Sequence, residues 1–283
     1  MFVQILSPFT TRELLPLATV SQRFHALILR LLHYRLFLSA SVTEYKLILE
    51  CFHPTSKLTE PHVFCKYLGT PGLSDKHEGE GSLYENIDTA KQLSRLGSLY
   101  SIFRPFPIED ESGAATPDLE KSSEDLLPVK RPVNIEGFED FSQLCVAVSL
   151  VKLLPGTTLL LSAVTLEDGV IRLFRDWLKS QADHPKESRQ IKDKPESWDH
   201  DQGLLWADKS KNVGVRFGVR ELTTLDSNFP VLVHRDEESF SRYEISIDEL
   251  HIRTTRLLLT VEQSIQEQES YPRAVVLQQA RPR

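Results

Sequence analysis

Apolar residues near the start of the chain recur at the spacing of a helix. Over residues 11–36 they stand three and four positions apart, which predicts helices with one apolar face. Thr10 or Thr11 is suited to cap the first of these helices, and Pro16 falls within about the first turn after that cap, where proline does least harm. A further helix is predicted over residues 166–181. Its apolar face comprises Val170, Ile171, Phe174, Trp177 and Leu178.

Elsewhere apolar residues alternate with polar ones, as they do in half-buried strands. Residues 213–221 alternate valine or phenylalanine with glycine or arginine. Residues 231–234 and 243–262 continue this alternation, and residues 157–166 form another strand-like run rich in leucine and threonine. The second half of the chain is therefore predicted to be rich in strands.

The two patterns together predict an α+β fold with two parts. A short helical module is expected over residues 1–40, followed over residues 41–270 by a β-rich domain with helical insertions, and a β-sandwich is one of the forms that such a domain can take. Residues 104–137 and 182–202 are polar and show no periodicity, so we expect them to be surface insertions. Residues 271–283 are expected to form a frayed tail.

Composition narrows the classes of function. The chain has 283 residues, 40% of them hydrophobic, which is enough for one large or two modest domains. Its net charge of −7, with no cluster of basic residues, argues against a nucleic-acid partner. The three cysteines indicate free thiols in a reducing compartment. No signal peptide or membrane-spanning run is evident, so we expect a cytoplasmic or nuclear protein without a membrane partner.

The stretch ILSPFTTRELLPLATVSQRFHAL, residues 5–27, resembles the F-box. In that module a short helix end of the form I-L-S-x-L precedes a leucine-rich helix and then a helix with V-S-x-x-[FW]. The first turn of the family pattern, L-P-x-E-[LVI], has no counterpart here, so we expect either a start site placed too far downstream or a weakly binding box. The matching residues that would contact the adaptor are Ile5, Leu6, Phe9, Leu14, Leu15, Leu17, Val20 and Phe24.

This resemblance, strongest to F-box proteins of filamentous fungi, implies a function without catalysis. F-box proteins attach a substrate to an SCF ubiquitin ligase by binding its Skp-type adaptor and, through the adaptor, a cullin scaffold. The chain would then be a substrate receptor for an unknown protein, and it would use no cofactor. No motif of a nucleophile elbow, a phosphate-binding loop or a zinc protease appears, which agrees with a non-enzymatic role.

A second interpretation stays open at this point. The opening helices could simply complete the core of a stand-alone β-sandwich that binds a protein or a glycan. In that case the apolar stripe would be covered by the rest of the chain rather than by a partner.

Three further groups of residues deserve weighing. Four potential zinc ligands occur within residues 51–65, but C-x-H is an unusual first pair of ligands and buried free cysteines are common, so we expect no metal. The Asp-His-Asp cluster over residues 199–201 lies in a polar stretch, so we expect it to be part of the solvated surface and not a catalytic group. The candidate zinc ligands are Cys51, His53, His62 and Cys65. The aromatic candidates for a recognition surface are Trp177, Trp198, Trp206 and Tyr243, with core packing favoured for Trp177.

Overall fold

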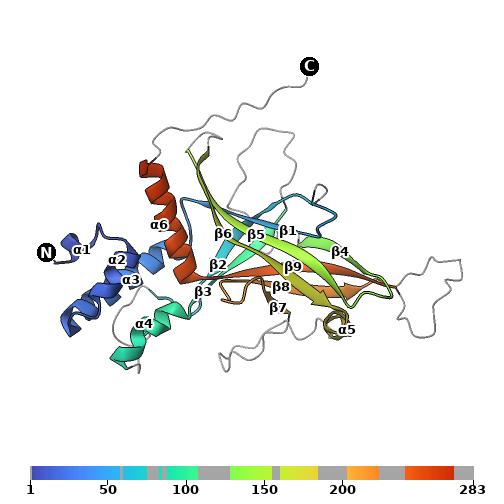
Figure 1. Ribbon diagram of the computed structural model, residues 1–283, viewed down its shortest axis with the longest axis horizontal. Coiled ribbons are helices and arrows are strands. Elements are labelled where there is room, and N and C mark those ends of the chain that lie inside the picture. Colours follow the sequence, from blue (N-terminus) through green and yellow to red (C-terminus); the bar gives the residue numbers. More distant parts are fainter. Residues whose placement is uncertain are drawn as a thin grey trace, which may run out of the picture.

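Most helices gather at one end of the molecule, and the strands make up the other end together with one short helix (Figure 1). This arrangement confirms the α+β class. The computed structural model describes a chain with several gaps, and the structural statements below concern its described residues. These are residues 2–57, 60–74, 83–84, 88–107, 128–154, 160–183, 203–222 and 240–270.

Three helices open the chain, as the apolar spacing predicts. They are α1 (Phe2–Leu6), α2 (Thr11–Leu17) and α3 (Gln22–Ala40). Thr10 caps α2 through a reciprocal pair with Glu13: the Glu13 amide donates to the threonine hydroxyl, and the Glu13 carboxylate accepts from the Thr10 amide at 2.7 Å. Ser21 caps α3 through a single hydrogen bond, which its hydroxyl accepts from the Phe24 amide. Pro16 is the second-last residue of α2 and not part of its first turn, so that expectation was wrong.

The strands form one continuous antiparallel sheet of nine strands. Their order across the sheet is β6-β5-β1-β2-β3-β9-β8-β7, and β4 pairs with β9. Because β8 occupies one edge of β9, strands β3 and β4 share its other edge, one at each end. The described strands are therefore not divided into the two layers of a sandwich. Their bounds are β1 (Lys46–Phe52), β2 (Val63–Gly69), β3 (Tyr100–Phe106), β4 (Val129–Ile135), β5 (Phe141–Leu153), β6 (Leu160–Phe174), β7 (Leu204–Trp206), β8 (Val213–Glu221) and β9 (Ser241–Arg253).

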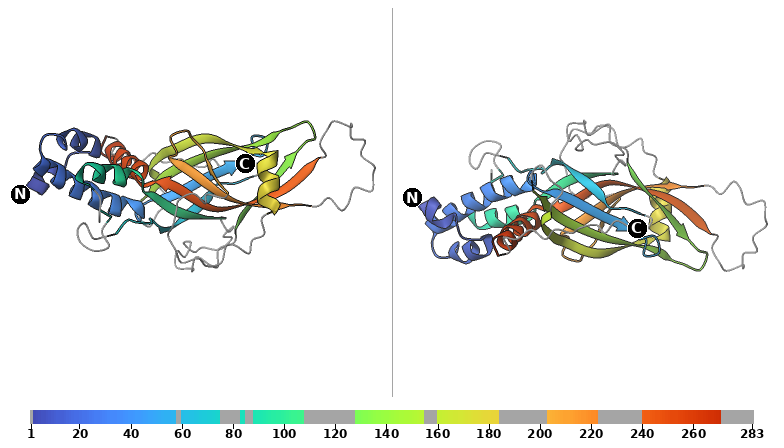
Figure 2. Two further views of the ribbon diagram at one scale, coloured as in Figure 1. Left: turned by 90° about the horizontal axis from the view of Figure 1, so that it is seen from below. Right: turned by 90° about the horizontal axis from the view of Figure 1, so that it is seen from above.

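The sheet curls until its two ends nearly meet, which gives it the form of an almost closed barrel (Figure 2). A methyl group placed on Gly169 of β6 would lie 2.5 Å from the carbonyl oxygen of Ala207, which follows β7. The interior holds the largest fully buried side chains among the described residues, including Phe103, Phe217 and Tyr243. A barrel of this size is filled by its own side chains.

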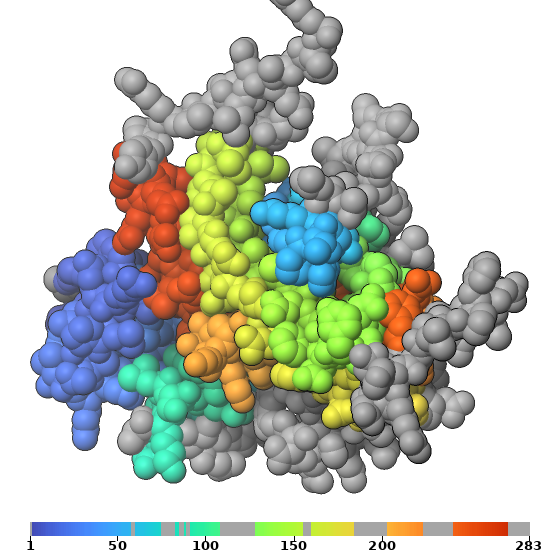
Figure 3. Space-filling model, turned by 45° about the vertical axis from the view of Figure 1, so that its right-hand side comes forward, coloured from blue at the N-terminus to red at the C-terminus, as the bar shows by residue number. Residues whose placement is uncertain are grey.

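Helix α6 (Thr254–Ser270) continues directly from β9 and connects the barrel with the opening helices. It packs against α3 on one side and β6 on the other (Figure 3). Leu257 belongs to the core of the barrel, whereas its neighbour Leu258 belongs to the apolar cluster of the helices. That second cluster also takes in α4 (Thr89–Gly97), while α5 (Arg175–Asp183) lies beside β8.

Two predicted elements change type in the structure. Residues 166–174 belong to β6, and only the end of the predicted helix is helical, as α5. From Val170 to Phe174 exposed and buried residues alternate strictly, and pairing along the whole of β5 stabilises the strand over the helix. The strand predicted over residues 243–262 ends at Arg253, after which Leu257, Leu258 and Val261 follow a helical spacing.

The polar insertions are shorter than expected. Residues 104–106 complete β3 and residues 129–135 form β4, while Ala182 and Asp183 end α5. Residues 108–127 and 184–202 of these insertions, the strand predicted over 231–234 and the tail lie outside the described residues. Among the helices that are described, none is long and apolar enough to cross a bilayer.

Candidate functional site

The eight residues that match the F-box divide into two groups in the structure. Leu6 and Leu14 are buried, at 6% and 0% exposure, in the cluster formed by the helices. Leu17 and Phe24 are partly buried and pack against the same cluster. These four side chains hold the helices together, which leaves less of their surface for a partner.

The other four residues point outward. Ile5, Phe9, Leu15 and Val20 are between 42% and 66% exposed, and each is large and apolar. Phe2 and Val3 of α1 are exposed as well. All of them lie on the helical end of the molecule, away from the barrel (Figure 1). Exposed apolar side chains gathered on one part of a surface are typical of a protein–protein interface.

Sequence analysis missed the outer side of α3. Tyr34, Phe37 and Leu38 are 43–61% exposed, whereas Leu32 and Leu36 on the other side of the helix are buried. The signal was present in the sequence, because the exposed residues also follow a helical spacing. It went unused because apolar residues on all sides of a helix do not reveal which side is covered.

One arginine fixes the helices to the rest of the chain. Arg35 of α3 donates to the carbonyl oxygens of Ser7 and Phe9 at 2.8 and 2.6 Å, and its other terminal nitrogen lies 2.9 Å from a carboxylate oxygen of Glu262 on α6. Glu262 also accepts hydrogen bonds from the amide and the hydroxyl of Thr11. No sequence motif marked this junction, because its partners are far apart in the chain.

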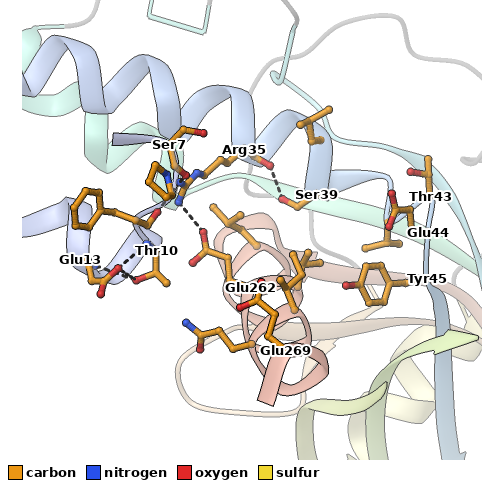
Figure 4. A pocket seen from close by; sticks show the side chains of 18 residues that line it. Ser7, Thr10, Glu13, Arg35, Ser39, Thr43, Glu44, Tyr45, Glu262 and Glu269 are labelled. Carbon is orange, nitrogen blue, oxygen red and sulfur yellow. Dashed lines mark hydrogen bonds and ion pairs between the residues drawn. The ribbon is translucent and has the colours of Figure 1, made fainter. Parts of the chain in front are cut away.

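A groove of about 720 Å³ opens beside this junction (Figure 4). Its walls come from the α1–α2 connection, α3, the segment before β1, and α6. Phe9, Leu38 and Ile265 supply apolar surface to the groove, and each is at least 42% exposed. The charged side chains that line it are Glu13, Arg35, Glu44, Glu262 and Glu269.

Two of these glutamates are held in the charged form. The pKa of Glu13 is lowered by the hydrogen bonds that it accepts from the amide and hydroxyl of Thr10. The pKa of Glu44 is lowered by Lys152, whose ammonium group lies 2.9 Å from its carboxylate. The groove is therefore negatively charged at neutral pH.

The candidate zinc ligands do not converge. Cys51 is buried in the barrel core, where loss of solvation raises its pKa to about 12, and Cys65 lies opposite Leu47, four positions along β1 from Cys51. His53 contacts the hydroxyl of Thr55, and the ring of His62 meets Phe64 edge to face. Within the residues that the structure describes, no three His, Cys, Asp or Glu side chains form a group able to hold a metal ion.

The structure places the aromatic candidates in different environments. Trp177 is partly buried against the barrel core, which confirms the packing favoured for it. Tyr243 is fully buried at 0% exposure, so it cannot belong to a recognition surface. Trp206 is partly exposed, and its ring lies tilted against that of Tyr100, with ring centroids 5.3 Å apart. Trp198 and the cluster 199–201 lie outside the described residues.

Comparison of the chain with protein-family models, with curated proteins and with solved structures gives no match.

Proposed function

We propose that the chain is a substrate receptor of an SCF-type ubiquitin ligase and that its opening helices bind a Skp-type adaptor. The observation that carries this proposal is the outward orientation of Ile5, Phe9, Leu15 and Val20 at the positions that resemble the F-box. Burial of apolar surface stabilises an interface by about 25 cal/mol per Å², so these side chains would contribute to binding once covered. The barrel would hold the target, and ubiquitin transfer would take place on other subunits.

A stand-alone binding module is the second candidate, and one observation favours it. The helices share their apolar cluster with Leu83, Tyr84 and Leu258, which belong to the rest of the chain. They therefore complete a core as well as presenting a surface. The two candidates differ in what they expect of the exposed residues: the receptor needs them for adaptor binding, whereas the stand-alone module does not.

The experiment is co-purification of the full chain with a purified Skp-type adaptor. We expect Leu15→Asp together with Val20→Asp to abolish binding, because each change places a charge in the apolar contact. A matched control carries Phe138→Asp and Val170→Asp, which change two exposed apolar residues outside the three opening helices. Thermal unfolding should show that both variants stay folded. Adaptor binding that survives the Leu15 and Val20 changes would rule out the F-box role.

A further inference from the structure

The groove beside Arg35 combines an apolar lining with an excess of negative charge. Four glutamates and one arginine line it, which gives a net charge of −3. The positive charge of Arg35 is already paired with Glu262, and Lys152 offsets Glu44 from outside the groove. Glu13 on one wall and Glu269 on the other make no ion pair with any residue that the structure describes (Figure 4). An occupant of this groove should be both basic and apolar.

The chain itself carries such a segment next to the groove. Residues 271–283, YPRAVVLQQARPR, contain three arginines and no acidic residue, with the apolar run Ala274–Leu277 between the first two arginines. The segment starts two residues after Glu269, a wall residue of the groove.

The dimensions allow this segment to return along α6. Thirteen extended residues reach about 43 Å, at roughly 3.3 Å per residue. The part of α6 that lines the groove, from Leu258 to Glu269, spans about 16 Å at 1.5 Å per residue. A short tether also gives an effective concentration in the millimolar range, so weak attraction is enough for binding.

We propose that residues 271–283 turn back at the end of α6 and occupy this groove in the same chain. The arginines would approach Glu13 and Glu269, and the apolar run would cover Phe9, Leu38 and Ile265. The inference concerns contacts within one chain and does not depend on an adaptor. Because Phe9 lines the groove, the bound segment would also restrict access to one edge of the exposed helical surface.

Hydrogen exchange of the full chain, followed by mass spectrometry, tests this contact. We compare the natural chain with a variant carrying Arg273→Glu, Arg281→Glu and Arg283→Glu. A matched control carries Arg12→Glu, Arg23→Glu and Arg30→Glu, three exposed arginines that do not line the groove. We expect amides of residues 264–283 to exchange roughly tenfold more slowly in the natural chain and the control than in the tail variant, a factor that corresponds to about 1.4 kcal/mol.

Two additional measurements sharpen the test. The protection should weaken at about 1 M salt, where the screening length falls to about 3 Å. Adding Glu269→Arg to the tail variant should restore part of the protection, because the new arginine on the groove wall would attract the glutamates introduced into the tail. The proposal would be overturned if the amides of residues 271–283 exchanged freely in the natural chain. It would also be overturned if the charge reversal left their exchange rates unchanged. Protection that increases with protein concentration would overturn it too, because the occupant would then belong to a second copy.

Discussion

Arg35 and Glu262 form an ion pair of 2.9 Å between α3 and α6, across 227 residues of sequence. Their side chains are 17% and 16% exposed, so the pair is largely shielded from water. The guanidinium also binds the carbonyl oxygens before α2, and the carboxylate also binds the first residue of α2. One pair therefore sets the position of all three opening helices relative to the barrel.

We expect Arg35→Ala to lower the free energy of unfolding by about 2–3 kcal/mol. The change leaves the Glu262 carboxylate without its cation and two backbone carbonyls without a donor, and loss of one partner from a shielded pair costs more than the pair itself contributes. Urea unfolding followed by circular dichroism measures the loss. Arg35→Ala and Glu262→Gln combined should cost less than the sum of the two single changes.

The control for this prediction is an exposed pair of the same length. Lys130 and Glu244 are also 2.9 Å apart, but the lysine is 51% exposed. We expect Lys130→Ala to cost less than about 1 kcal/mol, because water and salt screen such pairs. Equal losses at Arg35 and Lys130 would mean that the junction does not hold the helices.

Leu14 and Leu15 are neighbours on α2 with opposite environments, since Leu14 is 0% and Leu15 46% exposed. We expect Leu14→Ala to cost about 2–5 kcal/mol through loss of burial and the cavity left behind. Leu15→Ala should stay within about 0.5 kcal/mol. Thermal or urea unfolding of both variants checks the difference. A larger loss at Leu15 would show that α2 presents its other side to the core.

Gly169 marks the place where the barrel nearly closes. A methyl group there would lie 2.5 Å from the Ala207 carbonyl, so Gly169→Ala must push β6 away from the end of β7. We expect a loss of about 1–3 kcal/mol, the usual cost of overpacking. Gly97→Ala is the matched control: nothing lies within 4 Å of its added methyl group, and alanine at the end of α4 should stabilise by up to about 1 kcal/mol. Urea unfolding distinguishes the two signs.

Local sequence patterns predicted the elements that local forces determine. The helical spacing over residues 11–36 and the cap at Thr10 are confirmed, because both depend on neighbours within one turn. The strand predicted over residues 213–221 is confirmed as β8. Residues 166–174 were assigned to a helix because the decisive contact, pairing with β5, lies outside the local pattern.

Only part of the candidate site could be predicted from the sequence. Both Leu14 and Leu15 were selected because they are apolar, but only Leu14 is buried in the cluster formed by the helices. Tyr243 was expected at a surface because its ring suits binding, yet pairing of β9 with both β4 and β8 places it inside the barrel. The Arg35–Glu262 pair depends on the approach of two helices, which no local pattern encodes.

Glu249 on β9 links stability to acidic pH. His251 lies 2.8 Å from the Glu249 carboxylate, and this hydrogen bond lowers the pKa of Glu249 below its ordinary value of 4.5. The charges of Arg216 and Arg104 lower the pKa further, whereas partial burial raises it. A lowered pKa in the folded state means that the unfolded chain takes up the proton first as the pH falls. The contribution of this carboxylate is therefore complete above about pH 4.5, and it is lost as the pH falls through the lowered value.

We expect Glu249→Gln to reduce stability at pH 7. Between pH 5 and pH 3, roughly the titration range of a carboxylate, the stability of this variant should fall less steeply than that of the natural chain. The amide keeps the shape of the side chain but cannot carry the charge that His251 and Arg216 stabilise. Urea unfolding at half-unit steps of pH measures both slopes. Parallel slopes would show that other carboxylates account for the acid sensitivity. A variant that gains stability at neutral pH would show that burial outweighs the hydrogen bond with His251 and the two arginine charges.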